Sequence, residues 1–275
     1  MNKELCIVHA NCQGEPLVSL LRLCPEFERR FEPRVFLNYA REPIPDEALA
    51  RCRLFLYQHL GPQWNGLASE ALLRKLDEDC ASLCIPNMFL KAYWPLWSGE
   101  PGFDFRDVLL DRLLGMGLGR REILHVYLRG PLAAKYDLAG LIESSKAYER
   151  EKETRTPVKY LHLVEERLRE ERLFNTVNHP NRRLLFHAAS EILRLLGLGP
   201  LDPELEERIP EPFPEFELPI HPQVAQWLGL SFAAPGTRFA VFGRRLAFEE
   251  YAAAYVDCRL AGSDDLVGHL QTGPQ

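Results

Sequence analysis

The sequence lacks any long hydrophobic run. No stretch approaches the roughly 18 uninterrupted apolar residues that a membrane-spanning helix requires. The N-terminal stretch MNKELCIVHANCQ has neither an apolar segment long enough for a secretory signal nor a small-residue cleavage site. These absences predict a protein without a membrane span or a signal peptide, and we expect a cytoplasmic location.

The sequence also has no excess of positively charged residues. Asp and Glu residues number 39 against 33 Lys and Arg residues, which gives a formal net charge of −6 with histidine neutral. General nucleic-acid binders carry an excess of positive charge, so this balance argues against that class. We expect small molecules or other proteins as partners, and no nucleic acid.

The seven cysteines form neither a metal-binding nor a disulfide pattern. Their number is odd, their spacings are scattered, and no pair shows the CxxC spacing of a metal motif. Such cysteines suit a reducing compartment, in which disulfides are rare. We therefore expect free thiols and no metal site.

What the sequence does contain is enough apolar material for a sizeable core, because 46% of its 275 residues are hydrophobic. In the first half, short apolar runs alternate with helical patterns, which is typical of a parallel sheet with crossover helices. The predicted strands cover residues 5–8, 34–39, 53–60 and 82–90, and the predicted helices cover residues 66–78 and a segment that starts at Pro16. The expected fold class is α/β, with a parallel-rich central sheet and crossover helices.

The second half is mainly helical from about residue 104. Helical patterns flank the glycine-rich stretch GMGLGR (115–120), so we interpret it as a turn between helices and not as a dinucleotide-binding loop. Later come a predicted strand over 239–243 and a predicted helix over 248–260. We expect a single α/β domain over residues 1–262, in which about 104–173 form a helical insertion or subdomain, and a C-terminal tail over 263–275.

The first stretch that indicates chemistry is ELCIVHANCQGE (4–15). Its apolar run predicts a buried strand and Pro16 suits the first turn of a helix, so Cys12 falls between the two. In parallel α/β sheets, ligands gather at this end of the strands. A helix N-terminus can activate a thiol, and the backbone N–H groups of Gln13 and Gly14 are candidate donors to an oxyanion, with Asn11 beside them.

The second stretch is VNHPN (177–181), which precedes an amphipathic helical pattern over 184–196. Pro180 suits the first position of that helix, which places Asn178 and His179 at its N-terminus. His179 is the candidate general base for Cys12, and Asn178 supplies a polar side chain. No third, orienting residue is evident, because Asp104, Asp107 and Asp111 are equally good candidates.

Structural roles account for the same residues. Free cysteines are often buried, and Asn or His at the start of a helix is an ordinary cap. His59 and His125 lie among apolar residues, which favours a core or boundary position. Gln58 and His59 nevertheless fall at the carboxyl end of a predicted strand, and this makes them second-tier candidates for the site.

Three pieces of the sequence together resemble the WcbI family of polysaccharide-biosynthesis proteins: NCQG after the first strand, IPNMFLKAYWP in the first half, and NHPNRRLL before the amphipathic helix. The resemblance spans most of residues 4–260. It implies coenzyme A or acetyl-CoA as ligand and O-acetylation of a sugar hydroxyl in capsular or cell-surface polysaccharide biosynthesis. Cys12 then becomes the catalytic thiol and His179 its partner.

The resemblance also implies that Asn87 to Pro95 lie near the site. The basic and aromatic residues nearest the motifs are the candidates for coenzyme A binding: Lys91, Tyr93, Arg182 and Arg183. The acceptor is then a sugar or a polysaccharide precursor. Neither that acceptor nor the route of the acetyl group, through Cys12 or directly to the hydroxyl, can be deduced from the sequence.

Two other functions stay open at this point. A cysteine hydrolase or an SGNH-like esterase also has a strand, a turn that bears the nucleophile, and a late histidine before a helix. A non-catalytic module that binds sugars or nucleotides would use the same polar residues only as hydrogen-bond partners.

Overall fold

The computed structural model describes residues 3–272, and these fall into two compact units. Unit 1 comprises Met1–Phe89, Tyr148–Glu166 and Asn178–Pro212, and unit 2 comprises Leu90–Ala147, Arg167–Val177 and Phe213–Gln275. None of the helices within the described residues is both long and apolar enough to cross a bilayer. All seven cysteines are free thiols.

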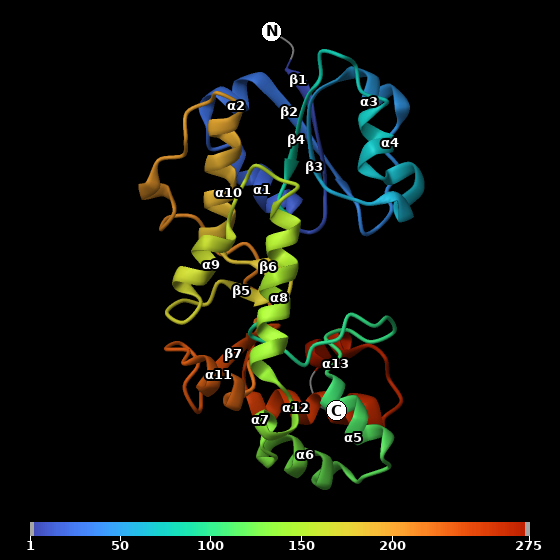
Figure 1. Cartoon of the computed structure of the whole chain (residues 1–275), viewed down its shortest axis with the longest axis vertical. Helices are drawn as coiled ribbons and strands as arrows, with labels where there is room; N and C mark the ends of the chain where they lie inside the picture. The colour runs from blue at the N-terminus through green and yellow to red at the C-terminus, as the bar shows by residue number, and fades with distance from the viewer. Residues whose placement is uncertain (1–2, 273–275) are drawn as a thin grey trace. The chain divides into compact units, whose positions relative to one another are not determined.

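A four-stranded parallel sheet forms the centre of unit 1 (Figure 1). Its strands lie in the order β2-β1-β3-β4: β2 (Phe31–Leu37), β1 (Glu4–Ala10), β3 (Cys52–Gln58) and β4 (Ala81–Ile85). The two inner strands are mainly apolar, and Cys6, Ile7 and Val8 are fully buried, as expected for strands covered on both faces. This confirms the predicted fold class.

Helices cover both faces of that sheet. Helix α1 (Gly14–Leu21), with α10 (Arg182–Leu195) against it, covers the face that carries Val8 and Ala10. On the opposite face Ile7 packs with residues of α3 (Asp46–Arg51) and α4 (Ser69–Leu73). A side chain on Gly14 would lie 3.1 Å from Ala10 Cβ and Val35 Cγ1, so a glycine lets α1 start directly against the sheet.

Unit 1 contains further elements, of which α8 belongs to both units. They are α2 (Pro25–Arg30), η1 (Pro62–Leu67), α8 (Leu138–Glu153), α9 (Leu161–Arg167, whose last residue belongs to unit 2), β6 (His179–Pro180) and η2 (Pro203–Leu205).

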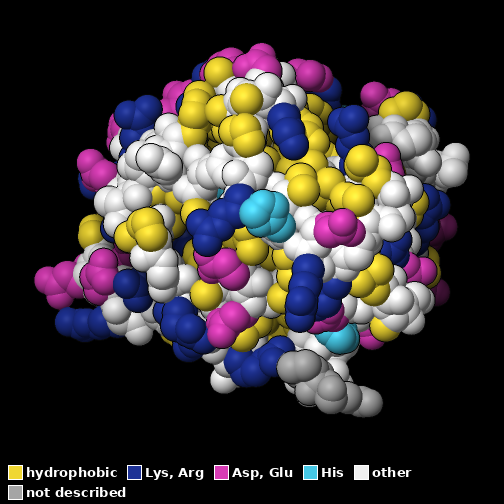
Figure 2. Space-filling model, turned by 90° about the horizontal axis from the view of Figure 1, so that it is seen from below, with side chains coloured by type: hydrophobic (Ala, Val, Ile, Leu, Met, Phe, Trp, Pro, Cys, Tyr) yellow, Lys and Arg dark blue, Asp and Glu magenta, His cyan; other side chains and the backbone are white. Residues whose placement is uncertain are grey.

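Unit 2 is mainly helical. Its elements are α5 (Val108–Gly115), α6 (Arg120–Arg129), α7 (Leu132–Lys135), β5 (Phe174–Thr176), α11 (Pro222–Leu228), the antiparallel pair β7 (Arg238–Val241) and β8 (Arg244–Ala247), α12 (Phe248–Leu260) and α13 (Leu266–Thr272). Figure 2 shows a face on which basic and acidic side chains are interspersed among apolar ones.

Asp107 organises the polar interior of unit 2. Its carboxylate accepts the N–H groups of Leu109 and Leu110 at 2.9 Å, which caps α5, and the hydroxyl of Tyr127 at 3.0 Å. Burial raises the pKa of Asp107 to about 6 despite these bonds. Of the three aspartates that the sequence offered as an orienting residue, this one has a structural role within unit 2.

Several predicted boundaries were wrong. The helix predicted over 66–78 is only Ser69–Leu73, preceded by the 3₁₀ turn η1, and the strand predicted over 82–90 ends at Ile85, before Pro86. Pro180 is not the first residue of α10, because Asn181 caps that helix by accepting the N–H of Leu184 at 3.2 Å. The interior of α10 and the helix over 248–260 were predicted correctly.

The secondary structure at the end of the chain and the exposure of two histidines also differ from what we predicted. The predicted tail contains α13, which buries Leu266 and Leu270 completely, while residues 273–275 lie outside the described residues. His59 and His125 are exposed and not buried. An apolar neighbourhood in sequence does not bury a side chain that points away from the core.

The fully buried histidine is His9, in the middle of the sheet. Neither of its ring nitrogens has a hydrogen-bond partner among the described residues. Burial lowers the pKa of His9 from 6.5 to about 4, with a small opposing effect from the Glu42 carboxylate. The ring is therefore neutral at pH 7 in the folded protein.

We expect His9→Leu to make the protein less sensitive to acid. The unfolded chain binds a proton at His9 as the pH falls below 6.5, whereas the folded chain does not until about pH 4. The free energy of unfolding of the wild-type protein therefore falls between these pH values. Urea unfolding measures the free energy of unfolding at pH 7.5 and at pH 5. We expect the decrease between the two pH values to be smaller in His9→Leu than in wild type by about 2 kcal/mol. The exposed His125→Leu is the control, and an equal pH loss in His9→Leu and wild type would contradict the expectation.

Candidate functional site

The strand order fixes where a ligand site is expected. Strands β2 and β3 lie on opposite sides of β1, so the connections that leave β1 and β3 diverge at their carboxyl ends. Such a switch in direction opens a crevice between the two strands, where parallel α/β proteins bind ligands. The turn Asn11–Gln13 follows β1 at this position, and Gln58 is the last residue of β3.

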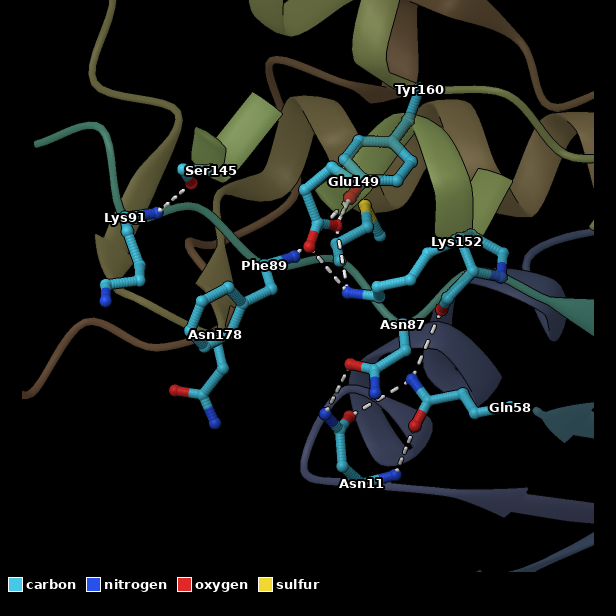
Figure 3. Close-up of polar contacts among 12 residues, drawn as sticks. Asn11, Gln58, Asn87, Phe89, Lys91, Ser145, Glu149, Lys152, Tyr160 and Asn178 are labelled. Atoms are coloured by element: carbon cyan, nitrogen blue, oxygen red, sulfur yellow. Dashed lines mark hydrogen bonds and ion pairs between the residues drawn. The ribbon is translucent and has the colours of Figure 1, made fainter. Parts of the chain in front are cut away.

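Gln58 is completely buried and binds the turn from the side of β3 (Figure 3). Its Oε1 accepts the backbone N–H of Asn11 at 2.8 Å and the side-chain amide of Asn38 at 3.2 Å. Its Nε2 donates to Asn11 Oδ1 and to the carbonyl of Pro86, both at 3.2 Å. The side-chain amide is thus satisfied on both its oxygen and its nitrogen.

Gln13, also buried, connects the turn to two further segments. Its Nε2 donates to the carbonyl oxygens of Met88 at 2.7 Å and Asn178 at 2.8 Å, and its Oε1 accepts the N–H of Met88 at 3.1 Å. Asn87 adds a bond in the same region, because its Oδ1 accepts Asn11 Nδ2 at 3.1 Å. The segment after β4 and the segment before α10 are therefore tied to the turn after β1.

Cys12 is half-buried at the centre of this network. The side-chain amide nitrogen of Asn178 lies 3.7 Å from Cys12 Sγ, within the distance of a hydrogen bond to sulfur. The backbone carbonyl of the same asparagine accepts from Gln13, as described above. His179 is the next residue in the chain and is half-exposed. The structure thus brings together the two motifs that were predicted to share a site.

The expected oxyanion donors have other acceptors in this conformation. The N–H of Gln13 donates to Asn11 Oδ1 at 3.0 Å, and the N–H of Gly14 donates to the carbonyl of Asn11 at 2.9 Å. Both bonds close the turn itself. The Asn178 side-chain amide is a donor within reach of Cys12 Sγ, at 3.7 Å, and it can stabilise a charge that forms there.

The four residues predicted to bind a cofactor do not share one environment. Arg182 makes ion pairs with Glu207 at 2.8 Å and Glu211 at 3.4 Å, and Arg183 pairs with Glu206 at 3.1 Å. Lys91 and Tyr93 belong to unit 2, where the ammonium of Lys91 lies over the Trp97 ring at 5.4 Å.

Tyr93 is fully buried and its hydroxyl donates to the carbonyls of Leu168 at 3.0 Å and Glu171 at 3.1 Å. These contacts are those of a packing residue, and burial raises the pKa of its hydroxyl. Its assignment to cofactor binding stays a prediction.

Sequence reasoning missed part of the site. It did not identify Asn38, whose side-chain amide donates to Gln58 Oε1 at 3.2 Å. Asn87 and Met88 fall in the stretch that the resemblance placed near the site, and both contact the turn. Asn87 also lines a cavity of about 550 Å³ in unit 1 together with His59, Trp64, Lys152 and Arg155. Asn38 directly follows the carboxyl end of β2, and that position was a usable signal. Met88 contributes backbone atoms, which no side-chain pattern reveals.

Comparisons with known proteins agree with this architecture. The family described as "Polysaccharide biosynthesis enzyme WcbI" matches residues 5–201. A solved structure of WcbI, described as a novel polysaccharide biosynthesis enzyme in a native form without a disulfide bond between coenzyme A and one of its cysteines, is similar with a TM-score of 0.74 and 17% identity, over 98% of this chain and 99% of that one. No curated protein sequence matches.

We expect Gln13→Glu to destabilise unit 1 strongly at neutral pH. The substitution keeps the shape of the side chain but turns a carboxylate oxygen toward the carbonyls of Met88 and Asn178, where an amide now donates. An uncompensated buried charge costs about 3–5 kcal/mol. Urea unfolding at pH 7.5 checks this, with the exposed Gln226→Glu as the matched control.

The deficit relative to wild type should shrink as the pH is lowered, because a protonated carboxyl regains one donor. A Gln13→Glu protein as stable as Gln226→Glu at pH 7.5 would show that these bonds do not hold the turn.

Proposed function

The chain belongs to the WcbI family of polysaccharide biosynthesis enzymes, and from this premise we propose that it transfers an acetyl group from acetyl-CoA to a sugar hydroxyl of a capsular or cell-surface polysaccharide or its precursor. The observation that carries the proposal is the contact between Asn178 and Cys12 Sγ, which joins the NCQG and NHPN segments. A thiol, a polar donor and a histidine are the groups that acyl transfer through cysteine requires.

The reaction can be written in two steps. The sulfur of Cys12 attacks the acetyl carbonyl, the carbon–sulfur bond to coenzyme A breaks, and the proton of Cys12 passes through His179 to the departing thiol. A sugar hydroxyl then attacks the acetyl group on Cys12 and gives its proton to His179, which returns it to the sulfur. In the direct alternative, the sugar hydroxyl attacks acetyl-CoA itself and His179 takes its proton.

The Asn178 side-chain amide has a defined part in the two-step route. Its position beside Cys12 Sγ lets it donate to negative charge that develops at the sulfur or the adjoining carbonyl oxygen. The bond from Gln13 to the Asn178 carbonyl keeps the residue in place. A donor held in advance needs no reorganisation when the charge forms.

Two observations support coenzyme A as the acyl carrier. The similar WcbI structure is described with reference to a disulfide between coenzyme A and a cysteine of that protein, which associates the two there. In this chain, a cavity with basic side chains includes Asn87, whose side chain contacts the residue before Cys12. Free thiols and acetyl-CoA as donor both fit a cytoplasmic location.

Coenzyme A should stabilise the folded protein. At about 100 times its Kd, binding adds roughly 2.7 kcal/mol, which for a chain of this size raises Tm by about 5–10 °C. Thermal unfolding with and without coenzyme A or acetyl-CoA measures this. If neither compound shifts Tm, acetyl transfer from coenzyme A is ruled out, and release of acetate from simple esters would then support a hydrolase.

Substitution at Cys12 and His179 should separate the two routes. Cys12→Ala is expected to lower kcat for acetyl transfer by about 10³-fold if the acetyl group passes through the sulfur, and His179→Ala by a similar factor in either route. Cys80→Ala and His125→Ala are the matched controls and should keep wild-type rates.

Circular dichroism should show that all four variants fold. Full activity in Cys12→Ala would exclude the two-step route, and full activity in His179→Ala as well would exclude the proposed site.

A further inference from the structure

The segment 87–89, which follows β4, is held from two sides. On one side it contacts the turn after β1, because Gln13 bonds both the N–H and the carbonyl of Met88, and Asn87 bonds Asn11. These contacts belong to the candidate site. On the other side the segment meets a buried polar cluster of α8 and of the connection between α8 and α9, to which the proposed reaction gives no role.

The centre of that cluster is Glu149, which is fully buried. Its two oxygens accept from Lys152 Nζ at 2.7 and 2.9 Å, and one of them also accepts the hydroxyl of Tyr160 (Figure 3). A carboxylate has about four lone-pair sites, so it can accept a further donor. A buried acceptor of this kind fixes the donors around it, because water cannot replace a bond that is lost there.

The further donor is the backbone N–H of Phe89. Its nitrogen lies 3.5 Å from the Tyr160 hydroxyl oxygen. Its hydrogen bond to the Glu149 carboxylate is one of the contacts that lower the pKa of that group, against the larger opposite effect of burial. Phe89 directly follows Met88 in the chain. The buried carboxylate therefore holds the neighbour of the residue that Gln13 binds.

The cluster is itself anchored to the sheet. The hydroxyl of Thr156, between α8 and α9, donates to the carbonyl of Cys84 in β4 at 2.8 Å. Glu153 closes the same connection, since its Oε1 accepts the N–H groups of Tyr160 and Leu161 at 2.6 and 2.7 Å. Glu149 thus bonds the segment 87–89 from a base that is fixed on both helices and on the sheet.

A chain of contacts leads from this base to the reacting sulfur. Met88 orients the side-chain amide of Gln13 through two hydrogen bonds. The nitrogen of that amide also donates to the carbonyl of Asn178 at 2.8 Å, and Asn178 Nδ2 lies 3.7 Å from Cys12 Sγ. If the segment 87–89 moves, Gln13 loses both bonds to Met88 and no longer holds Asn178 in place.

We propose that Glu149 is a positioning residue for the reaction at Cys12, because its carboxylate fixes the segment 87–89 and thereby the Asn178 amide beside the sulfur. The assignment rests on the proposed function, in which Cys12 is the reacting group. It acts through the backbone of Phe89 and Met88. The reactivity of Cys12, and not only the stability of the fold, then depends on Glu149.

The pH profile of Cys12 alkylation by iodoacetamide, measured on the full chain, tests this role. The thiolate is the nucleophile, so the midpoint of the profile reports how strongly nearby donors stabilise it, whereas the plateau at high pH reports exposure. Fragmentation mass spectrometry assigns the label to Cys12. The half-buried Cys80 is the internal reference.

Glu149→Leu/Lys152→Met is the informative variant. It removes one charge of each sign, and replacement of a buried ion pair by apolar side chains is often neutral for stability. The Phe89 N–H, however, loses the carboxylate. We expect the Cys12 midpoint to rise by about one pH unit, which leaves about tenfold less thiolate at pH 7, and kcat for acetyl transfer to fall by a similar factor.

Two comparisons separate positioning from stability. Glu149→Gln/Lys152→Met keeps an oxygen that can accept the Phe89 N–H, so it should restore the wild-type midpoint. Glu165→Gln is the matched control, because it removes an ion pair of 2.7 Å between the exposed Glu165 of α9 and Arg150 of α8, and it should keep the wild-type profile. Urea unfolding compares the stabilities of the variants.

An unchanged midpoint in the leucine variant, or an equal shift in both double variants, would overturn the positioning role. If the leucine variant does not fold, Tyr160→Phe takes its place, since it removes the hydroxyl that faces the Phe89 N–H. Its midpoint should also rise, and an unchanged one would overturn the role in the same way.

Alkylation requires no acetyl donor, so the two proposals can fail separately. A shifted midpoint in a protein whose wild type transfers no acetyl group would leave the positioning role intact and refute the acetyl transfer. Acetyl transfer with an unchanged midpoint and kcat in the leucine variant would refute only the positioning role.

Discussion

The hydrogen bonds of one buried side-chain amide, that of Gln13, hold the candidate site together. Its nitrogen donates to two backbone carbonyls and its oxygen accepts a backbone N–H, so three segments far apart in sequence meet on a single side chain. Buried backbone groups at loops need partners, and here they find them without regular secondary structure. The position of Cys12 relative to Asn178 follows from this bonding as much as from hydrophobic packing.

The sequence was sufficient for the elements whose burial pattern is strong. Strand β1 and helix α10 were identified because uninterrupted apolar residues mark a covered parallel strand and a 3.6-residue period marks an amphipathic helix. The errors fell where local signals compete. Pro180 fits a first helical position, but Asn181 is the better cap, and its side chain decides where α10 starts.

The candidate site was partly predictable for a related reason. The NCQG motif and Gln58 were found because parallel strands collect ligand-binding residues at their carboxyl ends. The NHPN motif was found because it precedes an amphipathic helix. The contribution of Met88 lies in its backbone, and that of Lys152 depends on α8 reaching unit 1, so neither follows from local pattern. The role expected of the Gln13 and Gly14 amides stays a prediction, because in this structure those N–H groups donate to Asn11.

The amides of Gln13, Gln58, Asn11 and Asn87 share partners, and this has a consequence for how the sequence can vary. When one of these amides is substituted, the hydrogen bonds of the others weaken as well. A second substitution then lowers the free energy of unfolding by less than it would in the wild-type protein. Effects of substitutions in such a group are epistatic, because each substitution destabilises the protein more when it is made first than when it follows another. Drift through single substitutions is therefore obstructed at these positions, and replacement of the network requires several coordinated changes.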